Sequence, residues 1–392
     1  MDNQKEYNRL TDRIKKIREE LHKHPEDCFK EIRTGEIIKE VLEEEKIPYR
    51  EGVAKTGIVA TIDSGKPGQT IAFRCDMDGL PMEEETGVDF ASENKGYMHA
   101  CGHDAHMTMV LGAGLILNRT KDQFSGKVIL IFQPAEEHGI DGGAKFMIEE
   151  GVLSEPKVDY IFGMHVWPDL GVDKIGITAG QLMASGDPWR VTLKGKAGHI
   201  SMPHKAINPL YAASQLIQSV ATIRTQKIDP FEDVVIDIGH MTTIDGHGNV
   251  IPKGVYLAAN TRCYKNSLRE EIKQWLVNTL DGLSKMHDID YDLEYHFGYA
   301  PVINDEDATN MMLESAKKVF KEEGIEEVTP VMGAEDFGEY LQHVKGSFAW
   351  IGVEQEEYVS LHNSKFFVTM KTIEKGILLY CQMVKDHMVE GS

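Results

Sequence analysis

Residues 97–107, "YMHACGHDAHM", contain three histidines, one cysteine and one aspartate. Imidazole, thiolate and carboxylate groups are the protein ligands of transition-metal ions, and a cysteine close to a histidine can also act as a nucleophile. A third interpretation requires no chemistry, because such polar residues can also begin a buried helix. The run alone does not separate a metal site, a nucleophile and a structural helix start.

Four further segments carry the same residue types, and most of them follow an apolar run that reads as a strand. Open α/β sheets place their sites at the carboxyl ends of strands. Burying so many carboxylates and imidazoles there without a cation would be costly in free energy. The pattern therefore favours a metal site. The four segments are "RCDMDGLP" (74–81), "QPAEEH" (133–138), "GMHVWP" (163–168) and "SLHNSKF" (360–366).

Each segment alone has an ordinary structural explanation. Paired glutamates such as Glu136 and Glu137 commonly form a solvated surface, and the spacing of Cys101 and His103 lacks the second close pair of a structural zinc site. A papain-like Cys101 nucleophile would leave the adjacent glutamates unexplained. The sequence has no G-x-S-x-G motif, no P-loop and no G-x-G-x-x-G after a strand. The prediction rests on the segments in combination.

The elements that must position these residues alternate along the first part of the chain. Helical spacing of apolar residues covers 7–22 and 34–45, and Pro25 stops the first helix. Compact apolar runs are typical of strands that are buried on both faces. This order favours a mostly parallel sheet flanked by helices. The predicted strands are 57–62, 70–76, 127–134 and 159–166.

From Asp187 onward the order of elements changes to β-α-β-β-α-β, which is the split-βαβ sandwich. After residue 300 the alternating pattern resumes. We therefore expect a catalytic domain of residues 1–183 and 298–392, interrupted by an inserted domain of residues 184–297. The elements of the insert are strand 189–197, helix 208–224, strands 234–244 and 254–264, helix 268–287 and strand 290–298. Those that follow it are helix 308–323, strand 347–353 and helix 372–385.

Length and composition limit the class of protein. A chain of 392 residues with 41% hydrophobic content can form two cores. A net charge of −21 argues against nucleic acid or an anionic membrane as the main partner. The longest apolar run, 107–117, is too short to cross a bilayer, and the N-terminus shows no signal-peptide pattern. Five scattered cysteines without a C-x-x-C pair predict a reducing compartment, the cytoplasm.

Taken in order, the motifs resemble those of the M-twenty metallopeptidase family, in its amidohydrolase branch of aminoacylases, hippurate hydrolases and auxin-conjugate (IAA-amino acid) hydrolases. The resemblance runs from "LHKHPE" near residue 21 to the end of the chain. It implies a zinc-exopeptidase-like catalytic domain with an inserted ferredoxin-like α+β lid and dimerisation domain. The matching motifs are "RCDMDGLPMEEETG", "MHACGHDAHM", "FQPAEE", "GMHVWP", "NVIP", "GAEDF" and "LHNSKF".

The resemblance implies a dinuclear centre with two divalent ions per subunit, Zn²⁺ or Mn²⁺, with Co²⁺ and Ni²⁺ as alternatives. If the Cys101 thiolate bridges, one ion has Cys101, His103 and His165. The other ion then has Cys101, Glu137 and His362. Glu136 matches the family's general base, which acts on a metal-activated water.

One position departs from the wider family. Asp76 matches an aspartate that orients a ligand histidine, but the residue two before it, usually that histidine, is Arg74. A guanidinium cannot bind a metal ion, so Cys101 and His103 would replace the lost ligand, as in the amidohydrolase branch. Asp104 and His106 are expected to begin a helix without a catalytic role.

The inserted domain carries a second set of matches. His199, in "GKAGHISMPH", matches a lid histidine that reaches the scissile carbonyl, often from the neighbouring subunit of a dimer. Asn249 and Arg262 match positions that hold the substrate carboxylate, and an Arg fork suits that group. "HKAINPL" (204–210) and "HPEDCF" (24–29) depart from the branch's usual motifs. These departures bear on substrate preference more than on mechanism.

The sequence thus predicts a metal-dependent amidohydrolase that cleaves N-acyl-L-amino acids, an N-acyl amino acid deacylase or aminoacylase. A dipeptidase or carboxypeptidase, or an N-acetyldiaminopimelate deacetylase, would use the same site. A non-catalytic metal-binding scaffold and a cysteine hydrolase are the alternatives from other classes. The expected partners are a small N-acyl amino acid or peptide and further copies of the chain, as a dimer or tetramer through the lid. No nucleic acid or membrane partner is expected.

Overall fold

The computed structural model describes residues 2–355 and 357–389, so 390–392, the predicted end of the catalytic domain, lie outside the described residues. The chain forms two compact units. The first unit comprises Met1–Leu182, Ile303–Thr329 and Asp336–Ser392, and the second comprises Met183–Val302 and Pro330–Glu335.

The first unit is built on a mixed sheet with the strand order β1-β2-β4-β3-β5-β16-β6-β15. The four neighbours β4, β3, β5 and β16 are parallel, whereas β1 and β2 are antiparallel additions at one edge. The strands are β1 (Tyr49–Val53), β2 (Gly57–Asp63), β3 (Thr70–Asp76), β4 (Lys127–Gln133), β5 (Tyr160–Gly171), β6 (Ile175–Gly176), β15 (Ile325–Glu326) and β16 (Lys345–Val353).

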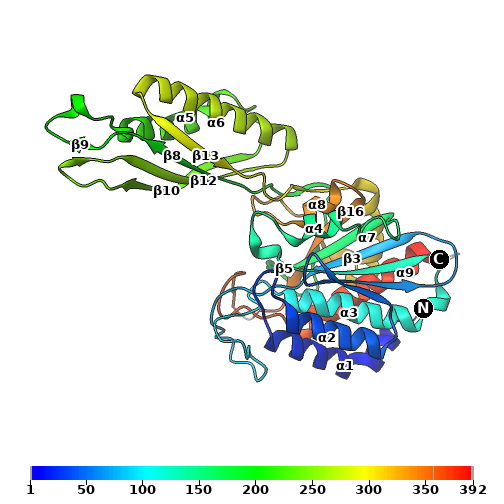
Figure 1. Cartoon of the computed structure of the whole chain (residues 1–392). Helices are drawn as coiled ribbons and strands as arrows, with labels where there is room; N and C mark the ends of the chain where they lie inside the picture. The colour runs from blue at the N-terminus through cyan, green and yellow to red at the C-terminus, as the bar shows by residue number, and fades with distance from the viewer. Residues whose placement is uncertain (1, 356, 390–392) are drawn as a thin grey trace. The chain divides into compact units, whose positions relative to one another are not determined.

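Helices cover both faces of this sheet. In Figure 1, α1, α2 and α3 lie on one side of the sheet and α4 and α8 on the other. α3 packs against α1 and α9, and α9 packs against α7. The helices are α1 (Asn3–Lys23), α2 (Ile32–Glu44), α3 (His103–Arg119), α4 (Gly143–Glu149), α7 (Glu306–Phe320), α8 (Phe337–Leu341) and α9 (Met370–Met388).

Burial explains why the strands carry continuous apolar runs. Every residue of β3 is buried, because helices pack on both faces of the sheet. α3 is buried from His103 to Leu117, which accounts for the apolar run in its sequence. The predicted fold class, a mostly parallel sheet flanked by helices, is confirmed. No helix in the described part of the chain is long and apolar enough to cross a membrane.

The second unit is a four-stranded antiparallel sheet of order β10-β12-β8-β13 that packs against two helices. Trp189, Leu193, Leu216 and Leu280 are part of its core. This is the β-α-β-β-α-β arrangement that the sequence predicts. Its elements are β8 (Asp187–Lys194), α5 (Pro209–Gln226), β10 (Val234–Ile244), β12 (Gly254–Cys263), α6 (Asn266–His287) and β13 (Asp290–Tyr295). The short strands β9 (Gly198–His199) and β11 (Val250–Ile251) pair beside them. β7 (Gly180–Met183) pairs with β14 (Val302–Asn304), and most residues of these two strands belong to the first unit.

The second unit includes Met183, residues 298–302 and residues 330–335, which the sequence analysis assigns to the catalytic domain. Of these, residues 330–335 join the second unit from a distant part of the chain. The reason is backbone pairing. The Ala184 N–H donates to the carbonyl oxygens of Val331 (3.1 Å) and Gly333 (2.9 Å), and the Tyr264 hydroxyl also donates to Val331. No sequence pattern signals this return of the chain.

Gly143, the first residue of α4, provides a test of how tightly the chain is packed after β4. A Cβ at Gly143 would lie 1.9 Å from the carbonyl oxygen of Pro134. Because the clash is with backbone, we expect Gly143→Ala to lower the free energy of unfolding by about 2 kcal/mol or more. Chemical denaturation of the metal-free protein measures this. Gly171→Ala is the control, since a Cβ there meets nothing within 4 Å, and equal stabilities of the two variants would contradict the expectation.

Candidate metal centre

The parallel strands bring the predicted ligands to one edge of the first unit's sheet. β3 ends at Asp76, and the chain then runs through a loop to Cys101 and the start of α3. β4 ends at Gln133 and is followed by a single 3₁₀ turn, η2 (Glu136–His138). His165 lies within β5. The loop after β16 carries His362, whose backbone N–H donates to the carbonyl oxygen of Ala100 (3.0 Å).

Two groups of ligand atoms form around one shared sulfur. Cys101, His103 and His165 form one group, and Cys101, Glu137 and His362 form the other. Within each group the ligand atoms all lie within 4.8 Å of one another. The Cys101 Sγ is 3.3 Å from the His165 Nε2, and the His362 Nε2 is 3.0 Å from the Glu137 Oε1. The structure therefore brings the five predicted ligands together in the two sets that the sequence analysis describes.

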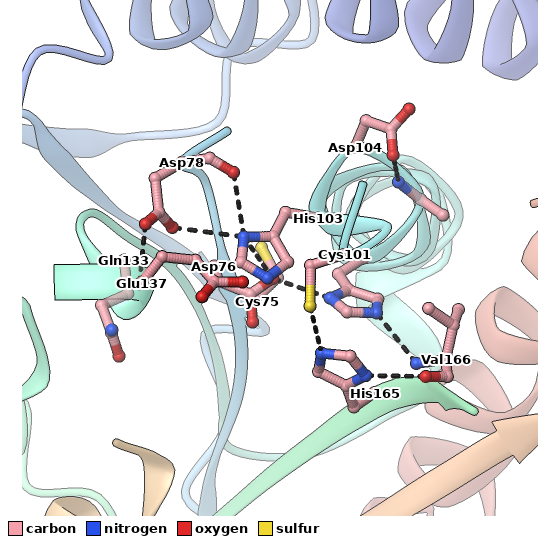
Figure 2. A network of polar contacts seen from close by, with 12 residues as sticks. Cys75, Asp76, Asp78, Cys101, His103, Asp104, Gln133, Glu137, His165 and Val166 are labelled. Atoms are coloured by element: carbon pink, nitrogen blue, oxygen red, sulfur yellow. Dashed lines mark hydrogen bonds and ion pairs between the residues drawn. The ribbon is translucent and has the colours of Figure 1, made fainter. Parts of the chain in front are cut away.

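The hydrogen bonds of two histidines leave a nitrogen for a cation. The Nδ1 of His165 lies 2.7 Å from the carbonyl oxygen of Val166, and the Nδ1 of His103 lies 2.9 Å from that of Asp78 (Figure 2). A carbonyl oxygen only accepts, so each Nδ1 must carry a proton. The Nε2 of His103 is buried and has no hydrogen-bond partner among the described residues. An imidazole fixed through its other nitrogen is the usual state of a metal ligand.

The electrostatics of this cluster also suit a cation. Burial lowers the pKa of His103, but the carboxylates of Asp76 and Asp78 outweigh it and raise the pKa to about 10. Burial and the nearby His106 hold the pKa of His165 well below its usual range. Burial, followed by the nearby carboxylate of Glu137, raises the pKa of the Cys101 thiol well above its usual range. Without a cation, His103 and Cys101 hold protons that a metal ion would displace.

Glu136, the predicted general base, lies next to these ligands. Its side chain is buried, with 7% of the residue exposed. One of its carboxylate oxygens lies within 4.8 Å of the ligand atoms of His103 and Glu137. A base in this position can reach a water bound between the two ligand groups.

The turn that carries Glu136 is fixed by a residue that the sequence analysis missed. The buried Glu31 accepts hydrogen bonds from the backbone N–H groups of Ala135 (2.9 Å) and Phe29 (3.0 Å) through its Oε1. Ala135 has a positive φ of 55°, a conformation that costs free energy for a non-glycine residue. Burial raises the pKa of Glu31 to about 7. Nothing in the local sequence marks Glu31, because its partner lies 104 positions away.

Asp76 forms an ion pair with the predicted ligand His103, but its hydrogen bond goes to His106, which is not a predicted ligand. Its Oδ1 accepts a hydrogen bond from His106 Nδ1 (2.7 Å), and its nearest approach to His103 is 3.8 Å, too long for a hydrogen bond. His106 Nε2 in turn accepts the backbone N–H of Val166, the residue after His165 (3.0 Å). Asp76 therefore acts on the β5 side of the cluster, through His106.

The other polar residues of the opening run are buried around the start of α3, which begins at His103. Asp104 forms a buried ion pair with Arg18 and a 2.5 Å contact with His22, both from α1. Burial opposes ionisation of Asp104, but these two cations keep its pKa well below its usual range. Burial lowers the pKa of His99 to about 4, so this imidazole is neutral. The expectation that Asp104 and His106 begin a helix is confirmed.

The predicted substrate residues of the second unit do not lie together. His199 is exposed and pairs with Val250, which follows Asn249. Arg262 lies eight residues beyond Gly254 on β12, a separation of about 26 Å at the usual rise of a strand. Within one copy of this unit, His199 therefore lies beside Asn249, whereas Arg262 lies at the opposite end of the sheet.

Comparison with known proteins now identifies the family. Residues 72–386 match the model of peptidase family M20/M25/M40. The chain belongs to this peptidase family. The N-acetyl-L-cysteine deacetylase of Bacillus subtilis is 36% identical over 92% of the chain and 84% of that protein. The hippurate hydrolase of Campylobacter jejuni is 33% identical over 97% of both.

Solved structures show the same fold over nearly the whole chain. An aminohydrolase described as putative, from methicillin-resistant Staphylococcus aureus, has a TM-score of 0.91 at 34% identity and covers 98% of both chains. A dinuclear metal-binding peptidase of the same family from Bacillus subtilis has a TM-score of 0.82 at 31% identity, over 96% of this chain and 98% of that one. The family consists of hydrolases that depend on a dinuclear metal centre, and the residues present fit that requirement: one shared thiol, three imidazoles and one carboxylate.

Metal binding should release protons. At pH 7 the metal-free protein holds protons on the Cys101 thiol and on the His103 Nε2, because their pKa values lie above 7. The apparent affinity for a divalent ion should therefore weaken about tenfold per released proton for each unit that the pH falls. Calorimetric titration with Zn²⁺ in two buffers of different ionisation enthalpy counts these protons. A heat that is the same in both buffers would contradict the assignment.

Proposed function

We propose that this protein is a metal-dependent amidohydrolase that cleaves the amide bond of N-acyl-L-amino acids. The observation that carries the proposal is the pair of ligand groups sharing Cys101, with the buried Glu136 beside them. The names of the relatives support the substrate class. Besides the deacetylase and the hippurate hydrolase, an N-acyl-L-amino acid amidohydrolase of Geobacillus stearothermophilus is 35% identical over 76% of the chain.

The five ligands would hold two divalent ions, Zn²⁺ or Mn²⁺, with Cys101 between them. Sulfur, nitrogen and oxygen donors together suit zinc, and Mn²⁺, Co²⁺ and Ni²⁺ fit the imidazole and carboxylate donors. Bound there, the ions supply Lewis-acid polarisation of the amide carbonyl and a water of lowered pKa. Hydrogen bonds to Val166 and Asp78 orient the imidazoles of His165 and His103 toward this task.

Glu136 carries the proton transfers. Its carboxylate accepts a proton from the attacking water and delivers it to the departing nitrogen, so that the amine leaves in neutral form. Burial keeps bulk water away from this carboxylate and strengthens its interactions. His199 would stabilise the oxyanion that develops on the carbonyl, and Asn249 and Arg262 would bind the substrate carboxylate.

A second candidate function uses the same site. Two thermostable carboxypeptidases of Saccharolobus solfataricus are 34% identical over 95% of the chain, and an N-acetyldiaminopimelate deacetylase of Streptococcus gordonii is 37% identical over 89% of it. All of these reactions hydrolyse an amide next to a free carboxylate. A panel of N-acetyl, N-benzoyl and N-acyl-diaminopimelate substrates and dipeptides, assayed with Zn²⁺ and Mn²⁺, ranks them directly.

Replacing the base should abolish turnover without emptying the site. We expect Glu136→Gln to lower kcat by a factor of about 10² to 10⁴, because the carboxamide cannot take a proton from water. Two metal ions per chain should remain, as measured by elemental analysis. Glu149→Gln, at an exposed glutamate of α4, is the control and should turn over normally. Near-normal turnover by a metal-loaded Glu136→Gln enzyme would refute this role and favour a different base.

We also propose that the active protein is a homodimer formed through the second unit, in which His199 and Asn249 serve the site of the neighbouring copy. The separation of about 26 Å between Arg262 and the end of the sheet that carries Asn249 supports this. Within one copy, a substrate carboxylate cannot contact both residues. Two copies related by a twofold axis can bring the opposite ends of their sheets to each site.

Mixed dimers test this exchange. Glu136→Gln and His199→Ala should each be inactive as homodimers. A mixed dimer, purified through two different affinity tags, should recover about half of the wild-type activity, because one of its two sites combines an intact Glu136 with an intact His199. If each chain used its own His199, both sites of the mixed dimer would be defective and no activity would return.

We assign the protein to the cytoplasm. All five cysteines are free thiols in the structure, and four of them are buried. Free cysteines are usual in a reducing compartment.

A further inference from the structure

Asp78 is a buried aspartate whose side chain contacts more than the His103 imidazole that its backbone carbonyl orients. It lies two residues beyond the end of β3, and 1% of the residue is exposed. Its Oδ1 lies 3.2 Å from the Nδ1 of His103, and its own carbonyl oxygen accepts from the same nitrogen at 2.9 Å. Its Oδ2 accepts the backbone N–H of Glu137 at 2.8 Å and the thiol of Cys28 at 3.3 Å. Figure 2 shows Asp78 between His103 and Glu137.

These contacts join the two ligand groups. His103 belongs to the group of His165, and Glu137 belongs to the group of His362. They come from different parts of the fold, since His103 begins α3 and Glu137 lies in η2 after β4. One carboxylate thus contacts a ligand of each predicted ion, with a different oxygen for each.

We propose that Asp78 is the positioning residue that couples the two metal positions, so that the affinities for both ions depend on it. This inference rests on the proposed dinuclear centre. Through His103, Asp78 fixes the protonated Nδ1 and increases the electron density of the ring, which strengthens the bond from the other nitrogen to a cation. Through Glu137, it anchors the first residues of the turn from which the carboxylate ligand and the general base both project.

The chemistry of the two contacts makes a carboxylate necessary. Both partners are N–H donors, so both oxygens of the side chain must accept. A carboxamide of the same shape has one accepting oxygen and one donating nitrogen. Asp78→Asn therefore faces one of the two donors with another donor, which is repulsive in a buried site. Asp78→Ala removes both acceptors.

Asp76 provides a matched comparison, because it is an equally buried aspartate two residues earlier in the chain. It reaches the cluster through His106 and the backbone N–H of Val166, next to His165. Its contacts therefore lie on the side of one ligand group, whereas those of Asp78 lie on both. Cys28 provides a second comparison, since its thiol contacts Asp78 without contributing to either ligand.

The test measures metal binding directly. Zn²⁺ is titrated against a chromophoric chelator into the metal-free wild-type protein and the variants Asp78→Ala, Asp78→Asn, Asp76→Asn and Cys28→Ala. We expect two ions in the wild type, and a loss of affinity of about 10- to 100-fold for both ions in the two Asp78 variants. Asp76→Asn should weaken one ion only, and Cys28→Ala should weaken neither. Circular dichroism of the metal-free proteins reports folding, and Asp78→Asn carries the test if Asp78→Ala does not fold.

A second readout is independent of metal. In the metal-free protein, backbone hydrogen exchange of residues 135–138 should become faster in Asp78→Ala, because the Glu137 N–H loses its acceptor, and should be unchanged in Asp76→Asn. Asp78 variants that bind both ions as tightly as the wild type, or that lose only one, overturn the inference. A wild-type protein that binds fewer than two ions would instead refute the dinuclear centre itself, so the two failures are distinguishable.

Discussion

The parallel pairing of β4, β3, β5 and β16 is the constraint on which the metal centre depends. Parallel neighbours run in the same direction, so the chain leaves each strand at the same edge of the sheet. The predicted ligands therefore converge at one edge although they are far apart in the sequence. They come from the segments after β4 and β16, from β5 itself, and from the loop between β3 and α3. An antiparallel arrangement of the same strands would place half of these segments at the opposite edge, and no cluster would form.

Convergence of so many polar groups creates a problem of buried charge, and Arg74 resolves part of it. Its guanidinium donates to Asp76 (3.0 Å), to Asp336 (2.6 Å) and to the side-chain oxygen of Gln133 (2.9 Å). This permanent cation therefore pairs with two of the buried carboxylates and lowers the free-energy cost of burying them. Asp78 and Glu137 lie beside the ligand groups, where their negative charge would balance that of metal ions. Arg74 thus supplies a fixed positive charge that organises the residues behind the predicted ligands.

The sequence predicts the fold well where burial imposes a pattern. Strands such as 70–76 and 234–244 appear at the predicted positions, because continuous or alternating apolar residues reflect which faces are covered. The candidate ligands are also recognisable, since their residue types are unusual at strand ends. Glu31 and Asp78 are different. Each acts through a hydrogen bond to a backbone N–H, 104 and 59 positions away, and a backbone donor leaves no trace in the sequence. The same holds for residues 330–335, which join the second unit through backbone pairing.

The predicted site residues of the two units differ in how freely they can vary. The predicted ligands Cys101, His103 and His165 are buried, and hydrogen bonds to backbone carbonyls hold the two imidazoles, so this part of the site has little freedom to change. His199 lies instead on the short strand β9 of the second unit, and Asn249 directly precedes its partner strand β11. Both residues are exposed, so substitutions there cost little stability. Deacetylases, a hippurate hydrolase and carboxypeptidases can then share the ligand framework. Differences in substrate preference must arise from residues outside it, because a change within the framework would alter metal binding before it altered specificity.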